Sequence, residues 1–158
     1  MNPELPDVLL RLGLATLIGA AIGLNRDLHG KPAGLRTHAL VALGSALIVL
    51  ACGHIAADFH AADAQSRAIQ GIITGVGFIG AGVIVHKVDQ SKVHGLTTAA
   101  AVWVAALVGA ACGTGAFMPV SIAALLLALV LIFGGRIERR VHGWLHPRTD
   151  GTSGPTDS

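Results

Sequence analysis

Residues 96–116 read LTTAAAVWVAALVGAACGTGA, a stretch without a single charged side chain. An α-helix needs about 20 mainly apolar residues to cross the hydrocarbon core of a bilayer. Four similar stretches occur elsewhere, and the charged residues lie in short clusters outside these stretches or near their ends. Hydrophobic residues make up 53% of the 158-residue chain and charged residues only 13%, whereas a soluble domain usually carries about 25% charged residues. The sequence therefore predicts an all-α, multi-pass membrane protein.

Five apolar stretches predict five transmembrane helices. They cover residues 8–24, 35–57, 68–85, 96–116 and 118–135. Pro119 suits the first turn of the last helix, where its missing N–H costs nothing. The segment 147–158 is rich in Gly, Ser, Thr and Asp, so we expect a disordered polar tail after a transmembrane domain that spans 1–146.

The positive charges predict an orientation for these helices. Nine of the eleven Lys and Arg residues follow the first, third or fifth apolar stretch, and only Arg11 and Arg67 lie on the other side. Because Lys and Arg gather on the cytoplasmic side, we expect the N-terminus outside and the C-terminus in the cytoplasm. Arg11 is close enough to its helix end to snorkel. Residues 1–7 lack the basic region of a signal peptide, so we expect the first helix to be retained.

Glycines spaced four apart predict close helix packing, because small residues let two helix backbones approach. The third stretch carries further glycines on more than one face, which favours the centre of the bundle; self-association through one face is the alternative. The glycines in question are Gly19 and Gly23 in the first stretch, Gly109 and Gly113 in the fourth, and Gly71, Gly75, Gly77, Gly80 and Gly82 in the third.

An internal repeat relates the first two predicted helices to the third and fourth. A shift of 61 residues places Ile18-Gly19-Ala20 on Ile79-Gly80-Ala81 and Gly34-Leu35-Arg36-Thr37 on Gly95-Leu96-Thr97-Thr98. Both helix pairs would cross in the same direction, as a parallel repeat. Thr37 and either Thr97 or Thr98 could then cap two helix N-termini that face one cytoplasmic vestibule.

Two groups of polar residues are candidates for function. The first lies in the connection 25–38 (NRDLHGKPAGLRTH), which suits a recognition site at the membrane surface; a solvated loop that follows the positive-inside rule is the alternative. Asp27 could pair there with Arg36 or Arg26. The second group opens the third helix, where Arg67 suits an interfacial anchor and Gln70 an interhelix contact. The complete candidate set is Asn25, Arg26, Asp27, Arg36, Thr37, His38, Arg67, Gln70, Thr97 and Thr98.

Several function classes lack their sequence signals. Aromatic residues make up 4% of the chain and form no basic, aromatic stripe for nucleic acid. Motifs for phosphate loops, serine hydrolases and zinc proteases are missing, and the histidines have no ligand-spaced companions. We therefore expect no enzyme, cofactor or metal site; Asp27 with His38 is the only pair that could serve acid–base chemistry. Cys52 and Cys112 lie in apolar runs and suit packing better than a disulfide.

Four blocks in order resemble the MgtC/SapB family of bacterial inner-membrane proteins. They are residues 22–27 (IGLNRD), 30–38 (GKPAGLRTH), 77–82 (GFIGAG) and 94–100 (HGLTTAA), the last followed by Trp103-Val104-Ala105. The resemblance runs from about residue 9 to residue 117. The family often has Glu where Asn25 stands and Arg where His94 stands, which indicates an exchanged pair or an altered site.

The resemblance implies a function in magnesium homeostasis and growth in low magnesium, and an association with virulence in pathogens. Family members are implicated in restraining the ATP synthase and in regulating cation ATPases. We therefore expect a non-enzymatic inner-membrane regulator that binds such a membrane protein. A small ion or solute transporter, or a channel component, is the alternative. The soluble C-terminal domain of the long members is expected to be absent, which leaves a virulence role open for a short form.

Overall fold

The structure is a computed structural model that describes residues 4–55, 60–85 and 94–145. These residues form five α-helices and, within the described ranges, no strand. All five helices are long and apolar enough to cross a membrane, which confirms the predicted fold class. The helices are α1 (Leu5–Leu28), α2 (Leu35–Ile55), α3 (Ala61–Val85), α4 (Leu96–Thr114) and α5 (Phe117–Leu145).

Helices α1, α3 and α5 extend beyond the apolar stretches that predicted them, whereas α4 ends at Thr114, two residues before its predicted end. α3 begins at Ala61 instead of residue 68, and α5 continues to Leu145 instead of ending at residue 135. The added part of α3 carries the exposed Asp63, which pairs with the exposed Arg67 one turn later at 2.5 Å. Hydropathy marks only the part of a helix that lipid surrounds, whereas backbone hydrogen bonds continue into the polar region. The predicted tail at 147–158 lies outside the described residues.

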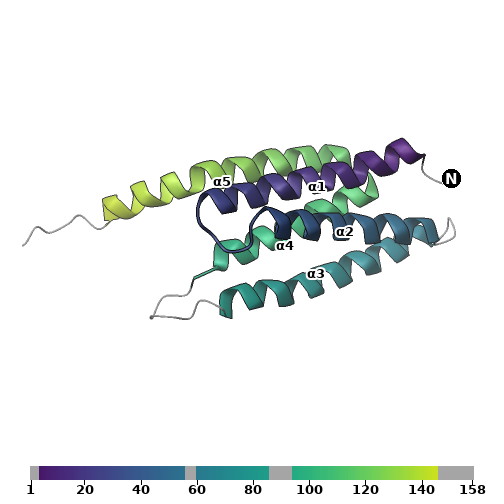
Figure 1. The fold of residues 1–158 in the computed structure, drawn as a ribbon, viewed down its shortest axis with the longest axis horizontal. Helices are drawn as coiled ribbons and strands as arrows, with labels where there is room; N and C mark the ends of the chain where they lie inside the picture. The colour runs from purple at the N-terminus through teal and green to yellow at the C-terminus, as the bar shows by residue number, and fades with distance from the viewer. Residues whose placement is uncertain (1–3, 56–59, 86–93, 146–158) are drawn as a thin grey trace, which may run out of the picture. The chain divides into compact units, whose positions relative to one another are not determined.

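Helices α1 to α4 and the start of α5 form one compact unit, which ends at Leu125. The chain runs back and forth through α1–α4, so the α1–α2 connection and the start of α4 lie at the same end (Figure 1). The end of α2 and the start of α3 lie at the opposite end. Residues from Leu126 onward form a second unit, which contains the remainder of α5.

Small residues bring α2 very close to both α1 and α4. A methyl group added to Gly19 of α1 would lie 2.6 Å from the His38 carbonyl oxygen of α2. A methyl group on Gly109 of α4 would lie 2.7 Å from the Cα of Ala42 and still closer to its carbonyl oxygen. Real Cβ atoms do not approach other atoms at these distances. The close approach of α2 to its neighbours therefore requires glycine at these positions.

Most glycines of α3 do not pack against another helix, although their spacing predicts that they lie inside the bundle. A methyl group on Gly71, Gly75, Gly77 or Gly82 would meet no atom within 4 Å, whereas one on Gly80 would lie 3.5 Å from the Ala99 Cβ of α4. Ile72, Val76 and Gly80 follow one another at intervals of four and form the packed face of α3. The internal packing predicted for Gly71, Gly75, Gly77 and Gly82 is therefore not found within the described part of the chain.

The contacts of the two helix pairs agree with the predicted repeat. Gly19 faces His38, and Gly80 faces Ala99, so both partners are displaced by 61 residues. The first helical hydrogen bonds correspond too: the His38 N–H donates to the Gly34 oxygen at 3.2 Å and the Ala99 N–H to the Gly95 oxygen at 2.8 Å. This correspondence supports a duplicated helix pair, which stays a prediction.

Candidate functional site

Arg26 is a buried cation near the end of α1. Its side chain is 5% exposed, and its Nη2 donates to the Thr98 Oγ1 of α4 at 2.9 Å. Its Nε is buried without a hydrogen-bond partner. The ion pairs among the described residues join Arg11 to Asp7 and Arg67 to Asp63, so Arg26 has no acidic partner in this part of the chain. An unpaired buried charge is costly, which makes this residue a candidate for function.

The packing of α1 explains why Arg26 points into the protein. Gly19, Ile22, Gly23 and Arg26 share one face of α1 at helical spacing, and all four are buried. A methyl group on Gly23 would lie 2.7 Å from the backbone nitrogen of Leu35. The start of α2 therefore lies directly on the face from which Arg26 projects.

Asp27 holds the start of α2 in this position. Its Oδ2 accepts a hydrogen bond from the Leu35 N–H at 2.8 Å. The ion pairs that the sequence suggested, with Arg26 or Arg36, are not formed by these described residues. A carboxylate is stabilised at a helix N-terminus because the first N–H groups have no partner within the helix. The carboxylate therefore caps α2, and Arg26 stays without a counter-charge.

Replacing Asp27 tests this capping function. We expect Asp27→Ala to lower the free energy of unfolding by about 1 kcal/mol, the usual cost of a lost helix cap. Asp27→Asn keeps an oxygen acceptor and should lose less. Thermal unfolding in detergent, followed by circular dichroism, measures both. Equal losses in the two variants would show that the charge, and not the hydrogen bond, is what matters.

His38 adds a second buried polar group at the same end. Its side chain is fully buried, and its Nδ1 lies 3.0 Å from the Gly34 carbonyl oxygen. Because a carbonyl oxygen only accepts, Nδ1 carries the proton and donates it. The Nε2 is buried and has no partner, and the ring lies within electrostatic range of Arg26 and Asp27.

Arg26, His38 and Thr98 therefore form a buried polar cluster where α1, α2 and α4 meet. The hydroxyl of Thr98 accepts a hydrogen bond from Arg26. It does not cap the N-terminus of α4, for which the repeat made it a candidate. The residue before α4 is Gly95, at φ +91°, and no side chain caps the helix there. Thr98 is placed toward Arg26 because positions 98, 101, 102 and 105 form the buried face of α4.

The other predicted residues lie outside this cluster. Arg36 and Thr97 are exposed, and Asn25 and Thr37 are half-buried. Arg67 is exposed and paired with Asp63 of its own helix. The interhelix contact expected for Gln70 is wrong: its side chain is exposed and donates to Ser66, one turn earlier in α3, at 3.5 Å.

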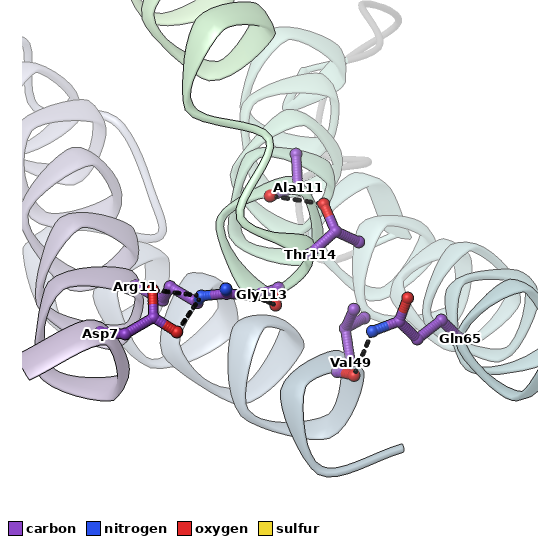
Figure 2. A network of polar contacts seen from close by, with 7 residues as sticks. All are labelled: Asp7, Arg11, Val49, Gln65, Ala111, Gly113 and Thr114. Atoms are coloured by element: carbon purple, nitrogen blue, oxygen red, sulfur yellow. Dashed lines mark hydrogen bonds and ion pairs between the residues drawn. The ribbon is translucent and has the colours of Figure 1, made fainter. Parts of the chain in front are cut away.

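The opposite end of the compact unit holds a polar network that the sequence did not indicate (Figure 2). The Nε of Arg11 lies 2.8 Å from Asp7 Oδ2, and its Nη1 donates to the Gly113 carbonyl oxygen at 3.0 Å. Gln65 of α3 donates to the Val49 oxygen of α2 at 3.4 Å. Arg11 therefore binds a free carbonyl at the end of α4 instead of only snorkelling.

A cavity of about 640 Å³ lies beside this network. Its lining includes Asp7, Arg11, His54 and Gln65. Across the described residues, no three His, Cys, Asp or Glu side chains lie close enough together to hold a metal ion. Cys52 and Cys112 are both free thiols. Arg11 joins α1 to α4, and Gln65 joins α3 to α2, so the side chains of this network hold helices together.

Residues 12–140, which include the whole buried polar cluster, match the profile of the MgtC family. The chain belongs to the MgtC family. It is 44% identical to the protein SrpB of Synechococcus elongatus over 82% of its own length and 75% of that protein. It is 43% identical to the protein SapB of Bacillus subtilis over 80% of its own length and 56% of the relative. No solved structure matches the chain.

A third relative carries a functional name. YhiD of Escherichia coli K12 is named "Putative magnesium transporter YhiD"; the MgtC-family chain is 43% identical to it over 70% of its own length and 53% of the relative. The chain thus spans about half the length of SapB and YhiD. None of the three names denotes an enzyme. Family membership and five spanning helices identify a multi-pass protein of the bacterial inner membrane.

Proposed function

We propose that this MgtC-family protein is a non-enzymatic regulator that serves magnesium homeostasis and growth in low magnesium. It acts by binding another membrane protein, of which the ATP synthase or a cation ATPase is the expected kind. The observation that carries this proposal is an exposed, small-residue stripe on α3. The orientation predicted from Lys and Arg, with the C-terminus in the cytoplasm, belongs to the same proposal.

The stripe consists of Gly71, Gly75, Phe78 and Gly82, which follow one another at helical spacing on one side of α3. Phe78 is 84% exposed, and the three glycines have open space where a Cβ would stand. The packed residues of α3, such as Val76, lie on another side of the helix. Glycine at these exposed positions gives lipid little to pack against, but it lets a partner helix approach closely. The stripe therefore suits a helix of another protein.

A transporter is the second candidate, and the buried polar cluster favours it. Ionisable residues within membrane helices often mark the path of an ion or proton, and Arg26 and His38 are such residues. The name of the relative YhiD points the same way for that protein. Flux of magnesium or protons through purified protein in liposomes decides between the two functions. Flux that an Arg26→Gln variant loses would favour transport over regulation.

Substitution in the stripe tests the regulator. We expect Gly75→Leu to place a large side chain on the stripe and to abolish growth in low magnesium while the protein accumulates normally. Gly77→Leu is the matched control, because Gly77 is equally open but lies off the stripe. A deletion strain complemented with each variant, grown across magnesium concentrations with intracellular ATP measured, gives the result. Wild-type growth of the Gly75→Leu strain would contradict the proposal.

A photo-crosslinking residue in place of Phe78 provides a direct readout of binding. In cells limited for magnesium, we expect it to capture a discrete membrane protein, and the Gly75→Leu substitution in the same chain should prevent capture. Recovery of crosslinks only between copies of this chain would replace the regulator with self-association through the stripe.

A further inference from the structure

We infer that the buried polar cluster binds a phosphate group, supplied by the headgroup of an anionic lipid or by inorganic phosphate. This inference does not rest on the proposed regulator function. It rests on Arg26, on the N-terminus of α4 and on the depth at which both lie.

The first step is the uncompensated charge. The guanidinium of Arg26 is nine-tenths buried and makes one hydrogen bond, to Thr98. Its Nε–H has no acceptor. Asp27 is the neighbouring acid in the chain, and its carboxylate is engaged with the Leu35 N–H. A buried cation with an unused donor calls for an anion that no described residue supplies.

The second step is the helix end that Arg26 reaches. Thr98 lies in the first turn of α4, where the leading N–H groups have no partner within the helix. The N-cap residue of α4, Gly95, has no side chain with which to cap this end, whereas Asp27 caps α2. The positive end of a helix dipole attracts phosphate. The guanidinium of Arg26 therefore contacts the first turn of α4 through Thr98.

The third step concerns access and depth. Arg26 lies two residues before the end of α1, and Thr98 lies two residues after the start of α4. At about 1.5 Å per residue, both are within one turn of the helix ends, where the polar headgroup region of a bilayer begins. Leu96 is 59% exposed and Thr97 is exposed. The first two residues of α4 are thus exposed at the level of the headgroup layer, and Arg26 and Thr98 are buried directly beside them.

The chemistry of the donors selects phosphate over a simple halide. A guanidinium presents parallel N–H groups that match two oxygens of one phosphate. His38 contributes an acceptor, because its Nδ1–H is donated to Gly34 and leaves Nε2 with a lone pair. That acceptor suits a hydroxyl, which hydrogen phosphate carries on phosphorus and phosphatidylglycerol carries on its headgroup. Both sources therefore fit the cluster.

The test uses the full chain in nanodiscs of neutral phosphatidylcholine. One arm adds sodium phosphate, with sodium chloride at equal ionic strength as reference. The other arm replaces part of the lipid with phosphatidylglycerol and omits phosphate. We expect one arm to raise the midpoint of thermal unfolding by about 3–6 °C at ten times the dissociation constant. The arm that responds identifies the source.

Two variants separate the site from diffuse charge. Arg26→Gln should lose the rise in midpoint, whereas Lys31→Gln, which removes one positive charge from an exposed position in the same connection, should keep it. Equal loss in both variants would overturn the site, and so would a wild-type midpoint that neither arm changes.

Native mass spectrometry of the wild type provides a readout that does not depend on whether Arg26→Gln folds. After release from phosphatidylglycerol nanodiscs or from phosphate buffer, we expect one retained phosphate-containing molecule per chain. Retention of none under both conditions would also overturn the inference.

Discussion

Gly109→Ala is expected to separate α2 from α4 and to lower the free energy of unfolding by about 3 kcal/mol or more. The added methyl group would overlap the carbonyl oxygen of Ala42 and lie 2.7 Å from its Cα. Overpacking in a well-packed core typically costs about 1–3 kcal/mol. Here the obstructing atoms are backbone, which cannot rotate away as a side chain does, so the cost should lie at or above the top of that range.

Unfolding in mixed micelles measures this effect. Rising dodecyl sulfate, with helix content followed by circular dichroism, gives a midpoint for each variant. Gly44→Ala is the control, because Gly44 lies in α2 itself and a Cβ there meets no atom within 4 Å. It should unfold at or slightly above the wild-type midpoint, since alanine is the better helix former. If Gly109→Ala and Gly44→Ala unfold together, α2 and α4 are not packed as described.

The second large effect is expected from Thr98→Val, which should cost about 1.5–3 kcal/mol, the usual value of a hydrogen bond to a charged group. Valine fills nearly the same space but cannot accept the Arg26 Nη2–H. Arg26 would then be buried without its one bond, and the remaining cost is the desolvation of an unpaired charge. The same micelle unfolding experiment measures the loss.

Two comparisons show whether the hydroxyl is responsible. Thr98→Ser keeps the acceptor and should stay within about 0.5–1 kcal/mol of the wild type. Thr37→Val changes the position that the repeat aligns with Thr98. Thr37 is half-buried, and the side chain of Arg26 binds Thr98 instead, so this variant should lose little. A Thr37→Val loss as large as that of Thr98→Val would mean that the Arg26–Thr98 bond does not stabilise the bundle.

The candidate site was predicted in part. Hydropathy locates the connection after α1, and the density of charge within it marks Arg26 and Asp27 as candidates. Their individual functions were not predictable. The sequence permitted an ion pair between Asp27 and Arg36, but the start of α2 offers Asp27 a backbone N–H at 2.8 Å. Which of the two forms depends on where Gly23 allows Leu35 to approach, and no local pattern records that.

The Arg11–Gly113 bond shows the same limit at the other end of the unit. Arg11 sits one turn after Asp7, so their pairing follows from helical spacing alone. Its second bond joins residues that are 102 positions apart in the chain. The acceptor is a backbone carbonyl, which every residue possesses, so side-chain identity carries no signal for it.

The sequence alone determines the number of helices and the fact that lipid surrounds them. Each apolar stretch forms a helix independently of the others, because in lipid its backbone N–H and C=O groups can form hydrogen bonds only within the segment. Packing decided which faces meet. Gly19, Gly71 and Gly109 occur in similar sequence patterns. In the structure, Gly19 and Gly109 lie against α2, whereas no other atom lies within 4 Å of a Cβ placed on Gly71. Arg26 is buried where α1 meets α4, and its hydrogen-bond partner there, Thr98, lies 72 residues away in the chain. Such contacts arise from three helices fitting together, and a single helix does not contain them.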